Sequence, residues 1–115
     1  MALPTKKELE IILEEAQIDN ILIFTSEGYL IESNSFDYDG NYAAMCGMIT
    51  KMCQETIKDL QYGNIDKITI HADKGLIMVN RFDEKNYMAC FTKDSSKQGV
   101  LMRIMNMIIS TATDS

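Results

Sequence analysis

Turn residues divide this chain into a fixed order of helices and strands, and that order limits its possible folds more than any other feature. Glu27-Gly28 separates two runs of β-forming residues, Asn20 to Thr25 and Tyr29 to Ser33. A short glycine-containing link between two such runs is typical of an antiparallel hairpin. The sequence therefore predicts a hairpin in the first third of the chain.

Three more β-rich runs follow later: Ile65 to Ala72, Leu76 to Arg81 and Tyr87 to Thr92. Asp73-Lys74-Gly75 divides the first from the second, and the polar patch from Asp83 to Asn86 turns the chain into the third. Turns this short join neighbouring antiparallel strands. The three runs are therefore predicted to form a meander.

Helical patterns fill the remaining intervals. Thr5 and Glu8 have the spacing of a capping box, in which each side chain accepts a hydrogen bond from a free backbone N–H at the helix start. An apolar stripe follows at helical spacing, made of Leu9, Ile12, Leu13 and Ala16. These residues predict a first helix before the hairpin.

The longest helix is expected between the hairpin and the meander, from about Asp39 to Tyr62. Asp37 or Asp39 can cap its start, and Gly63 can take the left-handed conformation at its end. A last helix is expected to start near Ser95 or Ser96 and to continue almost to the C-terminus. The predicted order is α-β-β-α-β-β-β-α.

Apolar side chains point to both faces of the predicted sheet. Alternate residues of a strand face opposite sides, yet the run Ile21 to Phe24 is apolar throughout, and so is Leu76 to Val79. Helices must therefore cover both faces. We predict an α/β (α+β) fold with a five-stranded antiparallel sheet in a three-layer sandwich, with the first and last helices on one face and the second helix on the other.

The run from Ile65 to Ala72 has a different pattern. Ile68, Ile70 and Ala72 face one way, while Lys67, Thr69 and His71 face the other. Such alternation predicts an edge strand or a strand at an interface. Because an exposed edge invites pairing with another chain, edge-to-edge dimerisation is one way to protect it.

The long second helix carries more apolar residues than one sheet contact needs. They cover about half of its circumference and comprise Met45, Met48, Ile49, Met52, Cys53, Thr56, Ile57 and Leu60. One part of this surface is expected to pack on the sheet and another on a partner, for which adaptable methionine side chains are suited. The opposite face carries Lys51, Gln54, Glu55 and Lys58, which are either solvated or form a docking surface.

Composition predicts one folded domain, residues 1 to 115, located in the cytoplasm. The 46% of hydrophobic residues suffice for a core. A net charge of −6 without clustered Lys and Arg disfavours nucleic acid and anionic membranes as ligands. The longest apolar run, from Val100 to Ile109, is too short to cross a bilayer, so no direct membrane insertion is expected.

Catalytic and metal-binding patterns are lacking in the sequence. Cys46, Cys53 and Cys90 have no paired CxxC spacing, which favours buried thiols over a zinc site or disulfides. His71 is the only histidine, and no motif places it with a nucleophile or a metal. We therefore expect a non-enzymatic protein without a cofactor or metal.

The hairpin from Ile21 to Ser33 resembles the first hairpin of the roadblock/dynein light chain domain family. Three other features extend the resemblance over nearly the whole chain. They are the Ala- and Met-rich helix after Asp39, the Asp73-Lys74-Gly75 turn, and the loop from Asp94 that leads through Gly99 into an aliphatic helix. The resemblance implies a single roadblock-like domain with a profilin-like sheet and helices on both faces.

Members of that family form homodimers or heterodimers in which the third strands pair antiparallel and the second helices lie side by side. The resemblance thus implies a dimer interface made of Ile65, Lys67, Ile68, Thr69, Ile70 and His71 with Met45, Met48 and Met52. It also implies a scaffold that activates or recruits a small Ras-like GTPase, and the chain resembles the stand-alone, bacterial gliding-motility type of this family. Lys51, Gln54, Glu55 and Lys58 would then contact the GTPase.

Activation of a GTPase can use an inserted arginine or can order the GTPase's own switch loops. Arg81 and Arg103 are the only arginines, and Arg103 is expected to pack within the last helix, so the ordering mechanism is favoured. Two other functions remain open. One is a profilin-like or PAS-like sensor whose ligand would contact Phe24, Tyr29, Phe91 and methionines of the second helix; the other is a dynein-type adaptor subunit.

Overall fold

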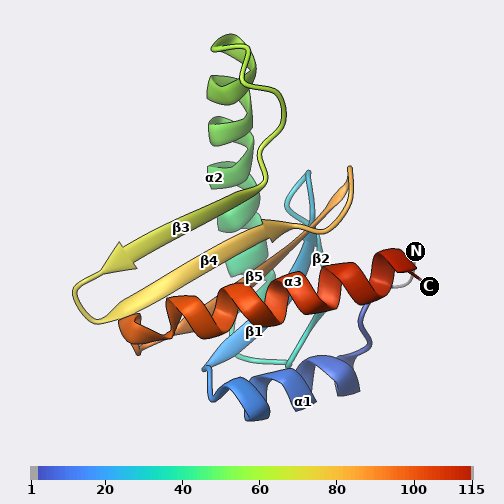
Figure 1. The fold of residues 1–115 in the computed structure, drawn as a ribbon, viewed down its shortest axis with the longest axis vertical. Helices are drawn as coiled ribbons and strands as arrows, with labels where there is room; N and C mark the ends of the chain where they lie inside the picture. Colours follow the sequence, from blue (N-terminus) through green and yellow to red (C-terminus); the bar gives the residue numbers. More distant parts are fainter. Residues whose placement is uncertain (1–2, 115) are drawn as a thin grey trace.

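The computed structural model describes the backbone of residues 3–114 and the side chains up to residue 110. The elements follow the predicted order (Figure 1). They are α1 (Lys6–Ala16), β1 (Asn20–Thr25), β2 (Leu30–Ser33), α2 (Asp39–Asp59), β3 (Lys67–Ala72), β4 (Gly75–Arg81), β5 (Asn86–Thr92), a 3₁₀ turn (Ser95–Lys97) and α3 (Gln98–Asp114).

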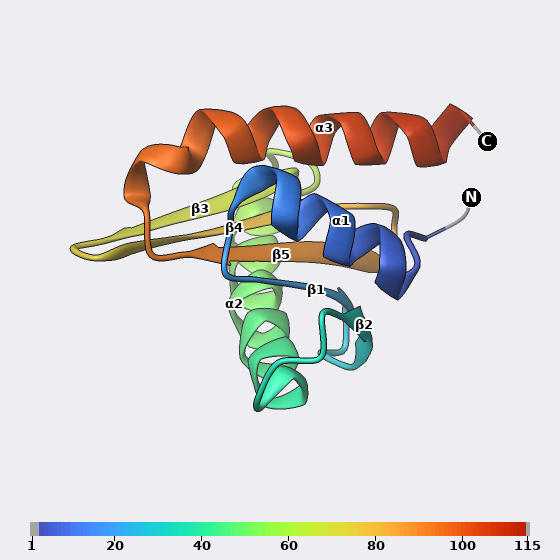
Figure 2. The same cartoon turned by 90° about the horizontal axis from the view of Figure 1, so that it is seen from below.

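All strand pairs are antiparallel, and the sheet order is β2-β1-β5-β4-β3. Helices α1 and α3 lie on one face of the sheet and α2 lies on the other (Figure 2). The three-layer prediction is confirmed, including the distribution of the helices, and β3 is an edge strand as its alternation indicated. Within the described residues, no helix has the length and apolar character needed to cross a bilayer.

Two apolar clusters fill the two layers of the core. The first joins α1 and α3 to one face of the sheet and includes Leu9, Ile21, Ile23, Met78, Leu101 and Met105. The second joins α2 to the other face and includes Leu22, Phe24, Ala43, Cys46, Val79 and Ala89. Neighbouring residues of β1 thus belong to different clusters, because a fully apolar strand supplies both layers.

The helix starts confirm one predicted cap and correct another. Thr5 Oγ1 accepts from the Glu8 backbone N–H at 3.2 Å, and Glu8 Oε1 accepts from the Thr5 N–H at 3.1 Å, which completes the predicted capping box. No side chain caps the start of α2. The residue before the helix, Tyr38, has a left-handed backbone conformation (φ 64°). The Asp39 carboxylate instead accepts from Ser33 Oγ at 2.7 Å and from the Gly40 N–H, so it fastens the end of β2 to the helix start.

Three element boundaries differ from the sequence prediction by more than one residue. Helix α2 ends at Asp59 instead of Tyr62, because Gln61 already takes a left-handed conformation (φ 61°) before Gly63 does. Strand β3 begins at Lys67 instead of Ile65, and Ile65 is buried in the core layer beneath α2. Ser95 and Ser96 form a 3₁₀ turn capped by Asp94, and α3 begins after it.

Small residues allow α2 to lie very close to the sheet. Its buried positions are Ala43, Cys46, Gly47 and Thr50. A Cβ built on Gly47 would lie 2.5 Å from Gly28 Cα, closer than packed atoms approach. Gly28 has φ +88°, a conformation that favours glycine, and it sits in the β1–β2 turn. This glycine pair fixes α2 against the first hairpin.

Candidate interaction site on α2 and β3

Helix α2 has three faces with different chemistry. At about 100° per residue, the small residues that meet the sheet, an apolar stripe and a charged face are centred roughly 120° apart. The buried residues of α2 at the sheet are all small, and the methionines are left on the outside of this chain. The sequence predicted two apolar surfaces on this helix, and the structure assigns the methionines to the outer one.

The apolar stripe of α2 is exposed. Met48 and Met52 are 66% and 67% exposed. The other exposed members are Tyr42, Met45 and Ile49, and Leu60 and Tyr62 continue the apolar surface just beyond the helix end. Tyr42, Met45, Ile49 and Met52 alternate spacings of three and four, the pattern by which one helix packs along another. Exposed apolar side chains gathered on one face mark an interaction surface.

The charged face of α2 contains three of its four predicted partner-binding residues as exposed side chains: Lys51, Glu55 and Lys58. Gln54 does not belong with them. Its Oε1 accepts from the Ile65 backbone N–H at 2.9 Å, so the side chain is half-buried and holds the segment before β3. Ile65 itself is only 7% exposed, which separates it from the predicted interface residues of β3.

Strand β3 presents a free backbone edge. Arg81 N–H donates to the Asp66 carbonyl at 2.9 Å, so this pair is hydrogen-bonded to β4. Hydrogen-bonded and non-bonded pairs alternate along an antiparallel ladder, and Thr69 pairs with Met78 three residues further along the register. The N–H and C=O groups of Lys67, Thr69 and His71 therefore point away from β4, toward the open edge.

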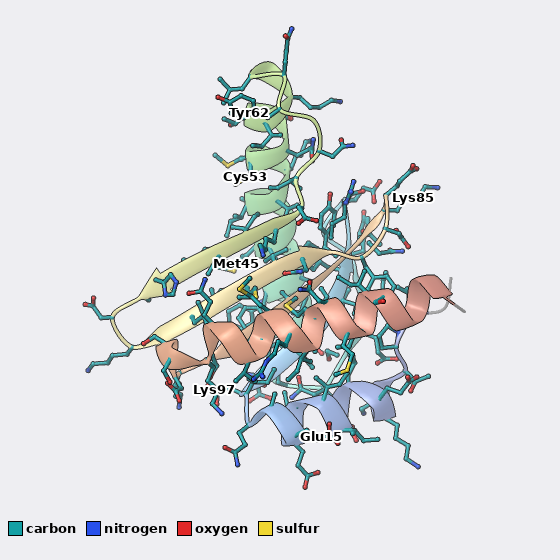
Figure 3. All side chains as sticks on the ribbon, viewed as in Figure 1. Glu15, Met45, Cys53, Tyr62, Lys85 and Lys97 are labelled. Carbon is teal, nitrogen blue, oxygen red and sulfur yellow. The ribbon has the colours of Figure 1, made fainter. Side chains whose placement is uncertain are left out.

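The part of α2 after its midpoint extends past this edge (Figure 1). Figure 3 labels Cys53 on that part and Tyr62 just beyond the helix end, whereas Met45 lies where the helix passes behind the sheet. Among the described residues, no other helix or strand stands over the outer end of α2 in this view. The free strand edge and the free helix end thus lie on the same side of the molecule.

An open groove of about 710 Å³ lies on the α2 side of the sheet, at the end that α2 does not cover. Ile70, Ile77 and Phe91 line it, and Lys74 and Lys93 are also among its lining residues. Half-buried isoleucines at an open sheet face are an incomplete core layer, because they would gain further burial from any apolar cover.

The groove and the apolar stripe are continuous through an aromatic cluster. The Tyr42 ring lies 6.1 Å from the Phe91 ring, and Phe36 lies 6.0 Å from Tyr42 and 6.1 Å from Phe91. Tyr42 belongs to the stripe and Phe91 to the groove. The sequence prediction missed Tyr42, although its three-residue spacing before Met45 was a usable signal, and it named Phe91 only as a contact of a possible sensor ligand.

The lining predicted for a ligand sensor does not come together. Phe24 is fully buried and stacks on Tyr87 with ring centroids 5.5 Å apart, whereas Tyr29 is 72% exposed. Of the residues predicted to contact such a ligand, only Phe91 lines the groove. Close contact between Gly28 and Gly47 fills the space between α2 and the first hairpin where such a ligand would have to sit.

Two of the three thiols lie in the core, as the sequence indicated, whereas Cys53 is half-buried. Cys46 and Cys90 are buried, and desolvation raises the pKa of Cys46 to about 11 and that of Cys90 to about 12. Both thiols are therefore protonated and poorly nucleophilic at neutral pH. Among the described residues, no group of three or more His, Cys, Asp or Glu side chains is arranged to hold a metal ion.

Solved structures with the same fold identify its class. Myxococcus xanthus MglB superposes with a TM-score of 0.80 at 9% identity, covering 90% of this chain and 87% of that one. A Roadblock/LC7 domain from Streptomyces avermitilis gives 0.76 at 13% identity, with 92% of each chain covered. An MglB with a tetrameric arrangement gives 0.72 at 13% identity, with 92% and 85% covered.

No protein-family model matches the sequence, and no curated protein matches it. The structural likenesses therefore concern the fold. This chain has the fold of roadblock/LC7 domains and of MglB, as the resemblance of its first hairpin, long helix and last loop implied.

Proposed function

We propose that this chain, which has the roadblock/LC7 fold, is a non-enzymatic homodimeric scaffold that binds a small Ras-like GTPase through α2. The observation that carries the proposal is the exposed apolar stripe of α2 beside the free edge of β3. A monomer would leave both surfaces in water. Association of copies is also a property of one protein of this fold, since an MglB occurs in a tetrameric arrangement.

Antiparallel pairing of β3 with its copy provides a partner for both surfaces. The two sheets become one continuous sheet, and the outward N–H and C=O groups of Lys67, Thr69 and His71 find hydrogen-bond partners. Helix α2 extends past β3, so its outer end comes to lie beneath the sheet of the other copy. Met45, Met48 and Met52 then face the same stripe of the partner helix.

The groove is a second argument for this antiparallel dimer. In the dimer, the outer end of the partner helix approaches Ile70, Ile77 and Phe91, which are only half-buried within one chain. Leu60 and Tyr62 are apolar side chains at that end, and both are exposed. Burial of apolar surface at about 25 cal/mol per Å² supplies the driving force for such an association.

Once the stripe is buried, the charged face of α2 remains outside. Lys51, Glu55 and Lys58 of the two antiparallel helices then form one composite surface with alternating charges. Such a surface suits recognition of a partner by electrostatic complementarity. We assign the GTPase contact to these three residues.

The GTPase would be regulated by ordering of its switch loops, because α2, which carries the proposed contact surface, contains no arginine. Arg81 ends β4 and is half-buried, and Arg103 lies on α3 in another layer. The sequence prediction that Arg103 packs within its helix is wrong, since its side chain is exposed. Arg103 is exposed, but it lies on α3 and not on the α2 surface that is proposed to bind the GTPase.

A Lys51→Glu, Lys58→Glu variant tests the GTPase contact. We expect its affinity for the cognate GTPase to fall roughly tenfold or more, because attraction to the partner becomes repulsion at two positions. Binding would be titrated with purified Ras-like GTPases encoded in the same genome, each loaded with GDP or a GTP analogue. The dimer mass should not change.

Lys6→Glu, Lys7→Glu is the matched control, because it makes the same charge change on the exposed first turn of α1. Equal loss of affinity in both variants would show a general charge effect and would argue against the α2 surface. A heterodimer with another roadblock-type chain is the second candidate arrangement. It is favoured if the purified chain is monomeric and becomes dimeric only with that chain.

A further inference from the structure

The two faces of β3 differ in chemistry. Ile68 belongs to the core layer under α2, and Ile70 lines the groove on the same side. Lys67, Thr69 and His71 lie on the other face, and the side chains of Lys67 and His71 are exposed. Figure 1 shows why: α3 crosses in front of β4 and β5 and leaves β3 uncovered.

Dimerisation through β3 has a fixed consequence for these side chains. Only Lys67, Thr69 and His71 have backbone groups that point to the open edge, as the Arg81 to Asp66 hydrogen bond establishes. In an antiparallel seam with two-fold symmetry, these residues must therefore pair with one another. Side chains of paired residues share a face of the sheet. Every register that satisfies the edge thus gathers two copies of the three side chains on one face.

We call these six side chains, three from each copy, the seam strip. The strip lies on the same face as α1 and α3, and one α3 flanks it on each side. Cross-strand neighbours have Cβ atoms roughly 4.5–5.5 Å apart. A lysine or histidine of one copy is therefore within reach of a basic or hydroxyl side chain of the other.

The chemistry of the seam strip is that of hydrogen-bond donors. An ammonium, an imidazole and a hydroxyl group all donate, and the ammonium groups carry charge. Like charges brought together across a seam are destabilising until an anion compensates them. The whole chain has a net charge of −6, whereas the strip contains lysine and histidine and no carboxylate, so it differs in charge from the chain as a whole.

A second observation comes from the strand beside it. Asn80 of β4 pairs with Lys67 and so shares its face. Its side chain is 5% exposed, and Oδ1 has no hydrogen-bond partner among the described residues. Buried amides without a partner are uncommon in folded proteins. The unpaired atom is an acceptor, so at the inner border of the strip it suits a backbone N–H of a ligand and not a carboxylate.

We infer that the seam strip is a docking surface for an acidic polypeptide segment, which lies along the two paired β3 strands between the α3 helices. The inference rests on the proposed dimer, because one chain supplies only half of the strip. An extended segment fits better than a point anion, since the donors form a row along two strands. Its carboxylates pair with Lys67 and His71, and its backbone carbonyls accept from Thr69.

The probe is a short glutamate-rich peptide labelled with fluorescein, titrated with the full chain while light scattering reports the mass. We expect saturable binding with one peptide for every two chains, because the strip lies on the two-fold axis. Lys67→Glu should weaken binding at least tenfold, since two cations of the dimer become anions. Lys74→Glu, with the same charge change in the β3–β4 turn, should alter the affinity by less than about twofold.

The measured mass separates the possible failures. If the chain is monomeric, the proposed dimer is wrong, and the seam strip is withdrawn with it. If the chain is dimeric but the peptide does not bind, or binds both variants equally, the dimer stands and the docking surface is overturned. A lysine-rich peptide of the same length should not bind, and binding of that peptide would also contradict the inference.

Discussion

A Thr69→Pro variant should be monomeric at concentrations where the unchanged chain is a dimer of twice 13.1 kDa. The Thr69 N–H points to the open edge and not to β4, so proline removes a seam hydrogen bond and leaves the ladder of the monomer intact. The proline ring also occupies the place of the partner strand. Light scattering on a dilution series would measure the change.

Thr69→Val is the matched control for this variant, because valine keeps the backbone N–H and a β-branched side chain. We expect it to remain dimeric. Circular dichroism should show the same helix and sheet content in both variants, since proline is tolerated on edge strands. A folded Thr69→Pro protein that stays dimeric would show that β3 is not the seam. The seam strip would then be ruled out as well.

A Gly47→Ala variant should lose about 2 kcal/mol of stability. The new methyl group would lie 2.5 Å from Gly28 Cα and 3.0 Å from Gly28 N, and both are backbone atoms that cannot rotate away. Overpacking of this kind costs about 3 kcal/mol, while alanine in place of glycine in a helix recovers about 1. We expect the melting temperature to fall by roughly 10 °C, measured at a fixed protein concentration because dimerisation also affects it.

Gly40→Ala is the control within the same helix. No atom lies within 4 Å of the position of its Cβ, so the substitution should leave stability unchanged or raise it by up to about 1 kcal/mol. A Gly47→Ala protein as stable as the Gly40→Ala protein would show that α2 can move away from the first hairpin. The small-residue contact would then not determine where the helix lies.

The glycine contact is linked to the proposed function through the methionines. Because Ala43, Cys46 and Gly47 suffice for the sheet contact, the large side chains of α2 are not needed in the core of this chain. A core built on Met48 and Met52 would instead hold the helix further from the sheet and leave no apolar surface for a partner. Close packing on one face therefore makes the outer stripe available.

The order and type of the elements could be predicted from the sequence, because they depend on local signals. The turn at Glu27-Gly28, the capping box of Thr5 and Glu8 and the alternation in β3 each involve residues close together in the chain. The apolar runs in β1 and β4 further required helices on both faces of the sheet. These local signals also indicated that β3 is an edge.

The tertiary structure decided what depends on residues far apart in the sequence. Which side of α2 meets the sheet is settled by the contact between Gly28 and Gly47, so the methionines lie outside. Helical spacing assigned Gln54 to the charged face. In the folded chain its side chain instead accepts a hydrogen bond from the Ile65 N–H and is half-buried. The sequence by itself determined the elements and their order through local turns and periodicity. Only the folded chain decided which faces remain free, because close packing and long-range hydrogen bonds select among surfaces that periodicity leaves equivalent.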